Sequence, residues 1–249
     1  MSMLSRFATL GGAATDPYWA NVSYLLVGNG ANGTTTNIKD SSSNNITTTR
    51  VGSPVISTAI NPPAITNAGS GTVYFPGSTA YLSLPMSSLF QVGSGQFTIE
   101  FWCYVSSIVN LTSIAGNFNV VAYPGNCNGW DIIFNGGGIT FRWGSPSYND
   151  TGALTFPTGQ WNHVAVVNTG SAIKMYVNGV QGGTTSTNNT ITNFSLANLF
   201  VGFGGSSSGL SIPPFNGYLY DFRFTKGVCR YTANYTPPPF PPTSAMPTQ

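Results

Sequence analysis

The first candidates for chemistry in this chain are its carboxylates. Hydrolysis of a glycosidic bond needs two carboxyl groups flanking the scissile bond. No pair here has an E-x-D-x-E-like spacing, and the single glutamate stands among aromatic strand residues. We therefore predict that the protein is not an enzyme and has no catalytic residues. The acidic residues are Asp16, Asp40, Glu100, Asp131, Asp150 and Asp221.

The only histidine, His163, is the second candidate. A Ser-His-Asp site needs partners that orient the imidazole, and a zinc site needs further nitrogen or sulfur ligands. The sequence contains no second histidine, and His163 falls inside an alternating apolar run. We expect a packed or hydrogen-bonded sheet histidine with no catalytic role.

Calcium is the third candidate, because loop carboxylates and amides are its usual ligands. The stretch SYNDTG supplies Asn149 and Asp150, and Asp131 could join them. Calcium takes six to eight oxygen ligands, so one or two carboxylates make a weak site at most. We predict no cofactor, with weak calcium binding as the alternative.

Glycan binding is the fourth candidate, because an aromatic ring can stack on a sugar while amides bond its hydroxyls. Two loops, residues 123–131 and 144–152, supply both residue types. The alternative is that the tryptophan belongs to the core and the others are ordinary turn residues, and both interpretations stay open. The candidate ligand-binding residues are Tyr123, Asn126, Asn128, Trp130, Tyr148 and Asp150.

The composition limits the classes of partner. Charged residues make up 6% of the 249, against about 25% in an ordinary soluble domain. So little charge repulsion favours packing into an assembly. The net charge of +2 comes from scattered basic residues, so we expect no nucleic-acid binding. Three cysteines form no disulfide framework, and we expect buried thiols, with one bridge plus a free thiol as the alternative.

Neither the N-terminal stretch nor any other segment predicts membrane targeting. Residues 1–22 lack the apolar core of a signal peptide, and no run approaches the roughly 20 apolar residues of a membrane span. We expect synthesis in the cytoplasm and no membrane span.

Short alternating runs punctuated by glycine and proline predict an antiparallel sandwich. Residues 96–105 alternate cleanly, with aromatics on both faces, which indicates a central strand in a covered sheet. Residues 71–85 read as two strands around a Pro76-Gly77 turn, and residues 129–144 as a hairpin. Residues 29–50 are polar and predict a long loop or an irregular edge. In the last strand, Tyr218, Tyr220, Phe222 and Phe224 alternate with Leu219, Asp221 and Arg223.

The two ends of the chain are predicted to be extended segments. We expect an N-terminal arm over residues 1–20, a jelly roll over 21–235 and a proline-rich extension over 236–249. The aromatic residues that could fasten the C-terminal segment to the domain or to a neighbouring subunit are Tyr231, Tyr235 and Phe240.

Three stretches resemble a known family. FTIEFWCYV, GQWNHVAVVNTGSAIKMYVNGV and FNGYLYDFRFTKGVCRYTANYTPPPFPPT look like the laminin G/pentraxin-like branch of the concanavalin A-like lectin/glucanase superfamily. The ending is similar to copies carried by virion proteins of tailed phages, and the resemblance covers roughly residues 16–242. An acidic HFDG-like turn of those proteins is absent, since residues 27–30 read VGNG.

The resemblance implies a two-sheet jelly roll (concanavalin A-like) and a binding function. We expect a non-enzymatic virion surface protein, made in the host cytoplasm, that decorates the capsid or associates with the tail. The lack of a fibre shaft favours this over the alternative, a tail fibre or spike that recognises host carbohydrate. The implied partners are other capsid or tail proteins, copies of the same chain and a host-surface glycan.

Overall fold

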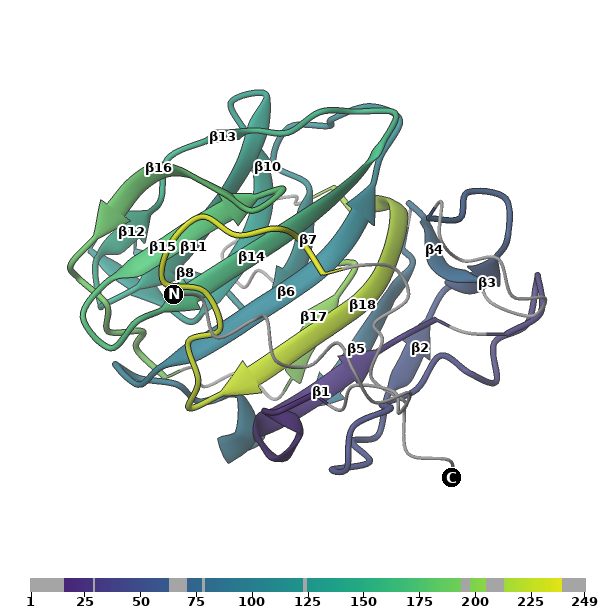
Figure 1. Ribbon diagram of the computed structural model, residues 1–249, viewed down its shortest axis with the longest axis horizontal. Helices are drawn as coiled ribbons and strands as arrows, with labels where there is room; N and C mark the ends of the chain where they lie inside the picture. The colour runs from purple at the N-terminus through teal and green to yellow at the C-terminus, as the bar shows by residue number, and fades with distance from the viewer. Residues whose placement is uncertain are drawn as a thin grey trace, which may run out of the picture.

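The computed structural model is a sandwich of two antiparallel sheets, which confirms the predicted all-β fold (Figure 1). It describes residues 16–28, 30–62, 71–77, 79–122, 125–193, 198–204 and 213–238. Most of the expected N-terminal arm, Tyr123, Phe240 and residues 239–249 lie outside them. Two short 3-10 helices, η2 (Trp19–Asn21) and η3 (Ser88–Phe90), accompany the strands. The described chain contains no helix long and apolar enough to cross a membrane.

Sheet A contains eight of the described strands. Seven follow one another across the sheet, and β1 (Val22–Leu26) pairs with β18 beside this path. The order is β16 (Val180–Ser186), β15 (Ile173–Val177), β14 (Trp161–Asn168), β6 (Phe97–Tyr104), β18 (Asn216–Lys226), β4 (Thr72–Pro76) and β3 (Val55–Ser57).

Sheet B also contains eight described strands, with β13 (Leu154–Thr155) paired to β11 beside the main path. A separate two-stranded ribbon joins β8 (Asn119–Ala122) to β9 (Asn126–Asn128). The order in sheet B is β12 (Tyr148–Asp150), β11 (Gly138–Gly144), β10 (Trp130–Asn135), β7 (Ser113–Gly116), β17 (Asn198–Val201), β5 (Tyr81–Pro85) and β2 (Thr49–Val51).

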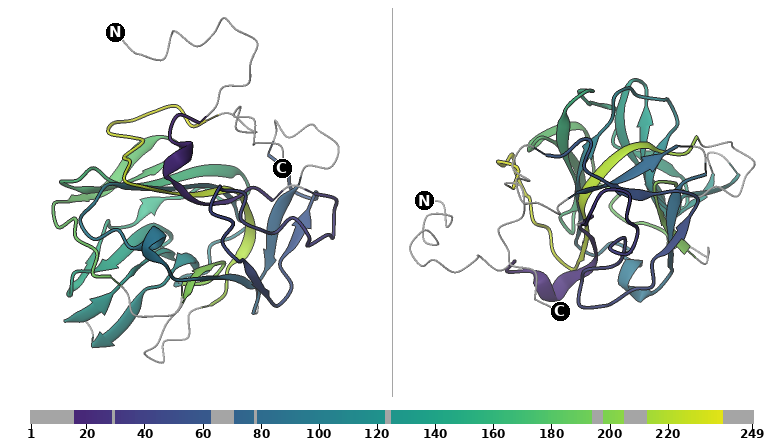
Figure 2. Two further views of the ribbon diagram at one scale, coloured as in Figure 1. Left: turned by 90° about the horizontal axis from the view of Figure 1, so that it is seen from below. Right: turned by 90° about the vertical axis from the view of Figure 1, so that its right-hand side faces the viewer.

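The hydrophobic core lies between the two sheets, which form separate layers in Figure 2. Along β6, alternate residues from Phe97 to Cys103 are fully buried against sheet B, because successive strand side chains point to opposite faces. Glu100 on the other face is also buried, with 3% of its surface exposed. The prediction of a central strand covered on both faces is confirmed.

The two predicted strands of residues 71–85 both form, but they do not pair with each other. β4 pairs with β18 and β3 in sheet A, whereas β5 pairs with β17 and β2 in sheet B. The Pro76-Gly77 turn, in which Gly77 has a φ of +76°, therefore carries the chain from one sheet to the other. Because β18 and β17, the partners that assign the two strands to different sheets, lie far away in sequence, local alternation could not show this.

The strict alternation expected along β18 is wrong, because a β-bulge interrupts it. The register with β6 shifts between Tyr220 and Arg223, and Asp221 has a φ of +50°. A bulge inserts one unpaired residue and changes which face the following residues occupy. As a result Phe222 enters the core while Tyr220 lies in a cluster on the outer face of sheet A. Asp221 and Arg223 share that outer face and bond to each other.

Residues 30–48 form a long loop, whereas the last two residues of the predicted segment 29–50 begin the edge strand β2. A buried aspartate organises the loop. Asp40 accepts backbone N–H bonds from Leu25 (3.1 Å), Ser42 (2.8 Å) and Ile46 (2.8 Å). Because buried backbone groups need partners, this one carboxylate lets a polar loop pack against β1 without a sheet ladder.

Candidate functional site

The β10–β11 hairpin places an ion pair on the outer face of sheet B. Asp131 and Arg142 are opposite each other across the two strands. Arg142 donates from Nε to Asp131 Oδ1 at 2.8 Å and from Nη2 to Oδ2. Asp131 is fully buried, and the side chain of Arg142 is 12% exposed. The bidentate geometry fixes the guanidinium plane beneath the neighbouring loop.

Two aromatic rings complete this outer-face group. The guanidinium of Arg142 lies 5.0 Å from the ring centroid of Phe118, and Tyr148 packs edge-on against Phe118 with centroids 6.1 Å apart. Burial raises the pKa of the Tyr148 phenol, and the carboxylate of Asp150 raises it further. Tyr148 therefore keeps its proton at neutral pH.

Hydrogen-bonded amide side chains lie on the segments next to Tyr148 at this end of sheet B. Asn188 donates to Asn149 Oδ1 at 3.0 Å and accepts from Ser145 Oγ at 3.1 Å. β9 lies alongside, because Cys127 N donates to Pro146 O at 2.5 Å. Of the predicted residues, Asn126 is exposed and Asn128, Tyr148 and Asp150 are half-buried on these adjoining segments. We call residues 126–128, 145–150 and 188 the amide surface.

Trp130 does not belong to the amide surface. It is 2% exposed, and its ring stacks at 6.0 Å on Phe141 and lies 5.9 Å from Phe224 in the core. Trp130 also lines a hollow with a volume of about 10 Å³, room for about one water molecule and too small for a sugar ring. Of the two interpretations of this tryptophan, the structure supports the core residue. The expectation that its face stacks on a ligand is corrected.

The carboxylates expected to hold calcium are engaged elsewhere. Both oxygens of Asp131 bond Arg142, and Asp150 Oδ1 accepts the backbone N–H of Gly152 at 2.8 Å. Among the described residues no three His, Cys, Asp or Glu side chains come close enough to share a metal ion. The amide surface consequently offers amide donors and acceptors and one carboxylate, that of Asp150, beside a phenol.

A second polar group, which we call the ionic cluster, lies on the outer face of sheet A. It gathers three of the six acidic residues and two of the eight basic ones. Arg230 donates to both oxygens of Asp16, at 3.0 and 2.8 Å, and Arg223 bonds the same carboxylate at 2.9 Å. Its members are Asp16, Glu100, His163, Asp221, Arg223 and Arg230.

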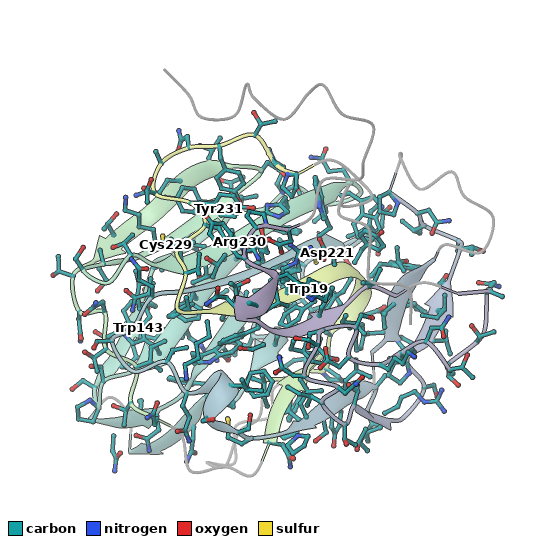
Figure 3. The ribbon with its side chains drawn as sticks, turned by 60° about the horizontal axis from the view of Figure 1, so that its bottom comes forward. Trp19, Trp143, Asp221, Cys229, Arg230 and Tyr231 are labelled. Carbon is teal, nitrogen blue, oxygen red and sulfur yellow. The ribbon has the colours of Figure 1, made fainter. Side chains whose placement is uncertain are left out.

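Residues 228–238, which we call the strap, cover this cluster (Figure 2, Figure 3). Tyr231 donates to Glu100 Oε2 at 2.6 Å and stacks on Tyr235 with centroids 3.6 Å apart. The Tyr235 hydroxyl bonds His163 Nδ1 at 3.0 Å, and His163 Nε2 lies 3.6 Å from Glu100. The prediction that His163 is packed in the sheet is confirmed. We expected Tyr231 and Tyr235 to fasten the C-terminal segment either to the domain or to a neighbouring subunit. In the structure both side chains bond to the chain's own domain.

Burial alone would raise the pKa of Glu100. The contact with His163 and the charges of Arg230 and Arg223 outweigh it and lower the pKa to about 2. A buried carboxylate held ionised between two arginines and a tyrosine hydroxyl has no free oxygen turned toward solvent. The cluster therefore holds the strap and the segment around Asp16 on sheet A, and it does not form an open catalytic site.

Few of these residues could be found from the sequence. Arg223 and Arg230 lie close together in the sequence, but Asp16 lies 207 and 214 positions away from them. Arg142 and Phe118 showed no signal, because only the pairing of β10 with β11 and the path after β7 bring them to Tyr148. The three cysteines are free; two are buried and Cys229 is half-buried.

The sandwich and its two outer-face groups define a lectin-like β-domain. The chain belongs to the concanavalin A-like lectin/glucanases superfamily, since the Laminin_G_3 family model matches residues 76–229, more than half of the sequence. No match was found among curated proteins.

Solved structures share this fold at low identity. Domain 4 of AbnA, an extracellular arabinanase from Geobacillus stearothermophilus, in complex with arabinotriose, is 19% identical with a TM-score of 0.58; the match covers 83% of this chain and 93% of that one. The binding domain of Paraclostridial Mosquitocidal Protein 1 is 17% identical with a TM-score of 0.57, and the match covers 85% of this chain and 50% of that one. The binding domain of botulinum neurotoxin DC in complex with SialylT is 14% identical with a TM-score of 0.57, and the match covers the same shares, 85% and 50%. The chain spans about half the length of these toxin domains.

Proposed function

We propose that this protein is a non-enzymatic phage virion surface protein whose lectin-like domain is attached to the particle and adheres to host glycans. The observation that carries the glycan-binding part is the amide surface, where hydrogen-bonded amides and the half-buried Tyr148 lie on adjoining segments. The neighbouring structures support it, because an arabinotriose and a SialylT complex are known on related sandwiches.

The amide surface fits a neutral or weakly polar sugar. Tyr148 supplies an amphipathic ring, and Asn126 and Asn128 supply donors and acceptors on β9, which is bonded to the segment before Tyr148. Tyr123, in the segment between β8 and β9, remains part of the proposed site, as does Asp150. Arg142 acts as a positioning residue, since it holds Phe118 against Tyr148 while its charge is neutralised by Asp131.

The carboxylates give no support to a hydrolase. Glu100 lies under the strap with its oxygens bonded to Tyr231 and paired with Arg230. Asp131 is paired with Arg142 on the opposite layer of the sandwich. Neither is placed to work with a second carboxyl group across a substrate.

Attachment to a virion rests on the resemblance of the chain's ending and on the low charge of the surface. Capsid or tail proteins and copies of this chain are the proposed partners there. The alternative is a tail fibre or spike protein whose main task is carbohydrate recognition; the amide surface would serve it equally well.

A glycan array probed with the full chain tests the binding function. We expect binding that weakens at least tenfold in Tyr148→Ala and is unchanged in Tyr74→Ala, a half-buried tyrosine on the other sheet. Absence of any bound glycan, or equal losses in both variants, would contradict it. Cryo-electron microscopy of the particle then decides the location. Density on the capsid or on the tail supports the virion role, density at a fibre tip favours the alternative, and absence from the particle refutes both.

A further inference from the structure

Four aromatic side chains form a row across the outer face of sheet A. The strand register aligns Tyr74 of β4 with Tyr218 of β18, Tyr104 of β6 and Trp161 of β14. Successive ring centroids are 4.6, 5.9 and 5.9 Å apart. All four side chains are partly exposed. We call these residues the aromatic row; it plays no part in the amide surface, which lies on the other layer.

Neighbouring rings of the row contact one another. Tyr74 and Tyr218 are stacked at 26°, and the Tyr74 hydroxyl donates to Asn216 Oδ1 at 3.5 Å. Tyr104 crosses Tyr218 at 81°. Partly exposed tyrosines and tryptophans side by side are the kind of surface on which proline-rich peptides dock in the polyproline II conformation.

The strap ends beside one end of the row. Tyr235 N donates to Gly179 O at 2.9 Å, and a Cβ on Gly179 would lie 3.2 Å from Pro237 Cδ. Asn178, next to Gly179, bonds the side chain of Asn162, the neighbour of Trp161, at 2.9 Å. Figure 1 shows the strap, in yellow, lying over β14 and β15 of sheet A. The chain beyond residue 238 therefore starts from the same face and close to Trp161.

The sequence of that continuation matches the row in chemistry and length. Residues 239–249, PFPPTSAMPTQ, contain four prolines and no charged side chain. Val55 and the four aromatic residues aligned with it across the strands are likewise uncharged. Eleven residues in polyproline II conformation span about 34 Å, whereas three strand spacings need about 14 Å.

We propose that the aromatic row binds the chain's own proline-rich segment, residues 239–249. The contact between the strap and sheet A then extends along the aromatic row. The proline rings of the segment pack on the exposed parts of the aromatic side chains, and no charged side chain is desolvated. Binding within one chain is favoured over binding to a second copy, because a short tether gives an effective concentration of the order of millimolar.

A peptide competition on the full chain tests this proposal. In an open variant, Pro239→Ser with Pro241→Ser and Pro242→Ser, the tethered segment can no longer dock. We expect a synthetic peptide of residues 237–249 to bind this variant at least tenfold more tightly than the wild-type chain in calorimetry. Adding Tyr218→Ala or Trp161→Ala should weaken that binding at least tenfold. Adding Tyr81→Ala, a tyrosine of the sheet B aromatic group with Phe200 and Phe203, should not.

The proposal is overturned if the open variant does not bind the peptide at millimolar concentration, or if wild type and open variant bind it equally. It is also overturned if Tyr218→Ala and Trp161→Ala, both with wild-type circular dichroism, retain full binding. Sedimentation of the wild-type chain as a dimer that dissociates in the open variant would assign the segment to a second copy and refute docking within one chain. None of these results depends on glycan binding.

Discussion

Glu100→Gln is the most informative single substitution in the ionic cluster. Glutamine has the shape of a protonated glutamate, so the substitution removes the charge while it leaves the packing under the strap intact. The side chain is buried, accepts the Tyr231 hydroxyl at 2.6 Å and lies 3.3 Å from Arg230 Nε. The change consequently leaves two arginines to share the remaining carboxylates, Asp16 and Asp221.

The expected loss in unfolding free energy follows from the pKa of Glu100. Folding lowers this pKa from 4.5 to about 2. At 1.36 kcal/mol per pKa unit, the ionised carboxylate stabilises the folded state by about 3 kcal/mol at neutral pH. Removal of one partner from a buried ion pair costs a similar amount, about 3–5 kcal/mol.

The sign of the pH dependence is fixed by the lowered pKa. The stabilisation is complete above the unfolded pKa of 4.5 and is lost as the pH falls toward 2. Urea unfolding followed by tryptophan fluorescence should therefore show a gap of about 3 kcal/mol between wild type and Glu100→Gln at pH 7, closing between pH 4.5 and 2. Asp150→Asn, which alters a half-buried carboxylate of the amide surface, is the matched control and should cost less than about 1 kcal/mol.

A loss below about 1 kcal/mol at pH 7 would show that the arginines do not depend on this carboxylate. A gap that stays constant from pH 7 to pH 2 would show that packing, and not charge, accounts for the loss. Either result would refute the reasoning about the cluster.

Three further outcomes follow from the same contacts. Tyr231→Ala should lower the unfolding free energy by about 3 kcal/mol in urea, because it removes a ring stacked on Tyr235 and the hydroxyl bonded to Glu100; a loss under about 1 kcal/mol would mean that the strap is not anchored there. Thiol titration of the native chain should detect only Cys229, slowly, since burial raises its pKa and Cys103 is fully buried; rapid modification of two thiols would contradict this. Trp130→Ala should destabilise the fold by about 3–5 kcal/mol, measured by thermal unfolding; an intact fold that lost only glycan binding would return Trp130 to the ligand site.

The fold could be predicted from the sequence because strand alternation is a local signal. The run from Phe97 to Tyr104 and the hairpin at Gly136-Gly137 are specified by residues next to one another, and both form as expected. The Asn178-Gly179 turn between β15 and β16, with positive φ at both residues, is of the same local kind. Where a strand's partner lies far away, as for β4 and β5, the local pattern shows that a strand exists but not which sheet it joins.

The candidate site was predicted less well, for reasons that are particular to its residues. The bulge at Asp221 depends on how β18 meets β6, and a two-residue period cannot reveal it. Trp130 is aromatic beside amides in the sequence, yet its place in the strand turns it inward. Asp16, far from any motif, is bonded by two arginines only because both ends of the described chain come to the same sheet.

Because both ends of the described chain lie on sheet A, the two layers of the sandwich carry different groups on their outer faces. The segment at Asp16 and the strap are fixed on the outer face of sheet A, and the aromatic row lies on that same face. The amide surface lies on sheet B, on the other side of the core. A domain held to a particle through its chain ends would therefore turn Tyr148 and its amides outward. The ionic cluster, the aromatic row and the proposed glycan site can then be altered one at a time, since the core separates the first two from the third.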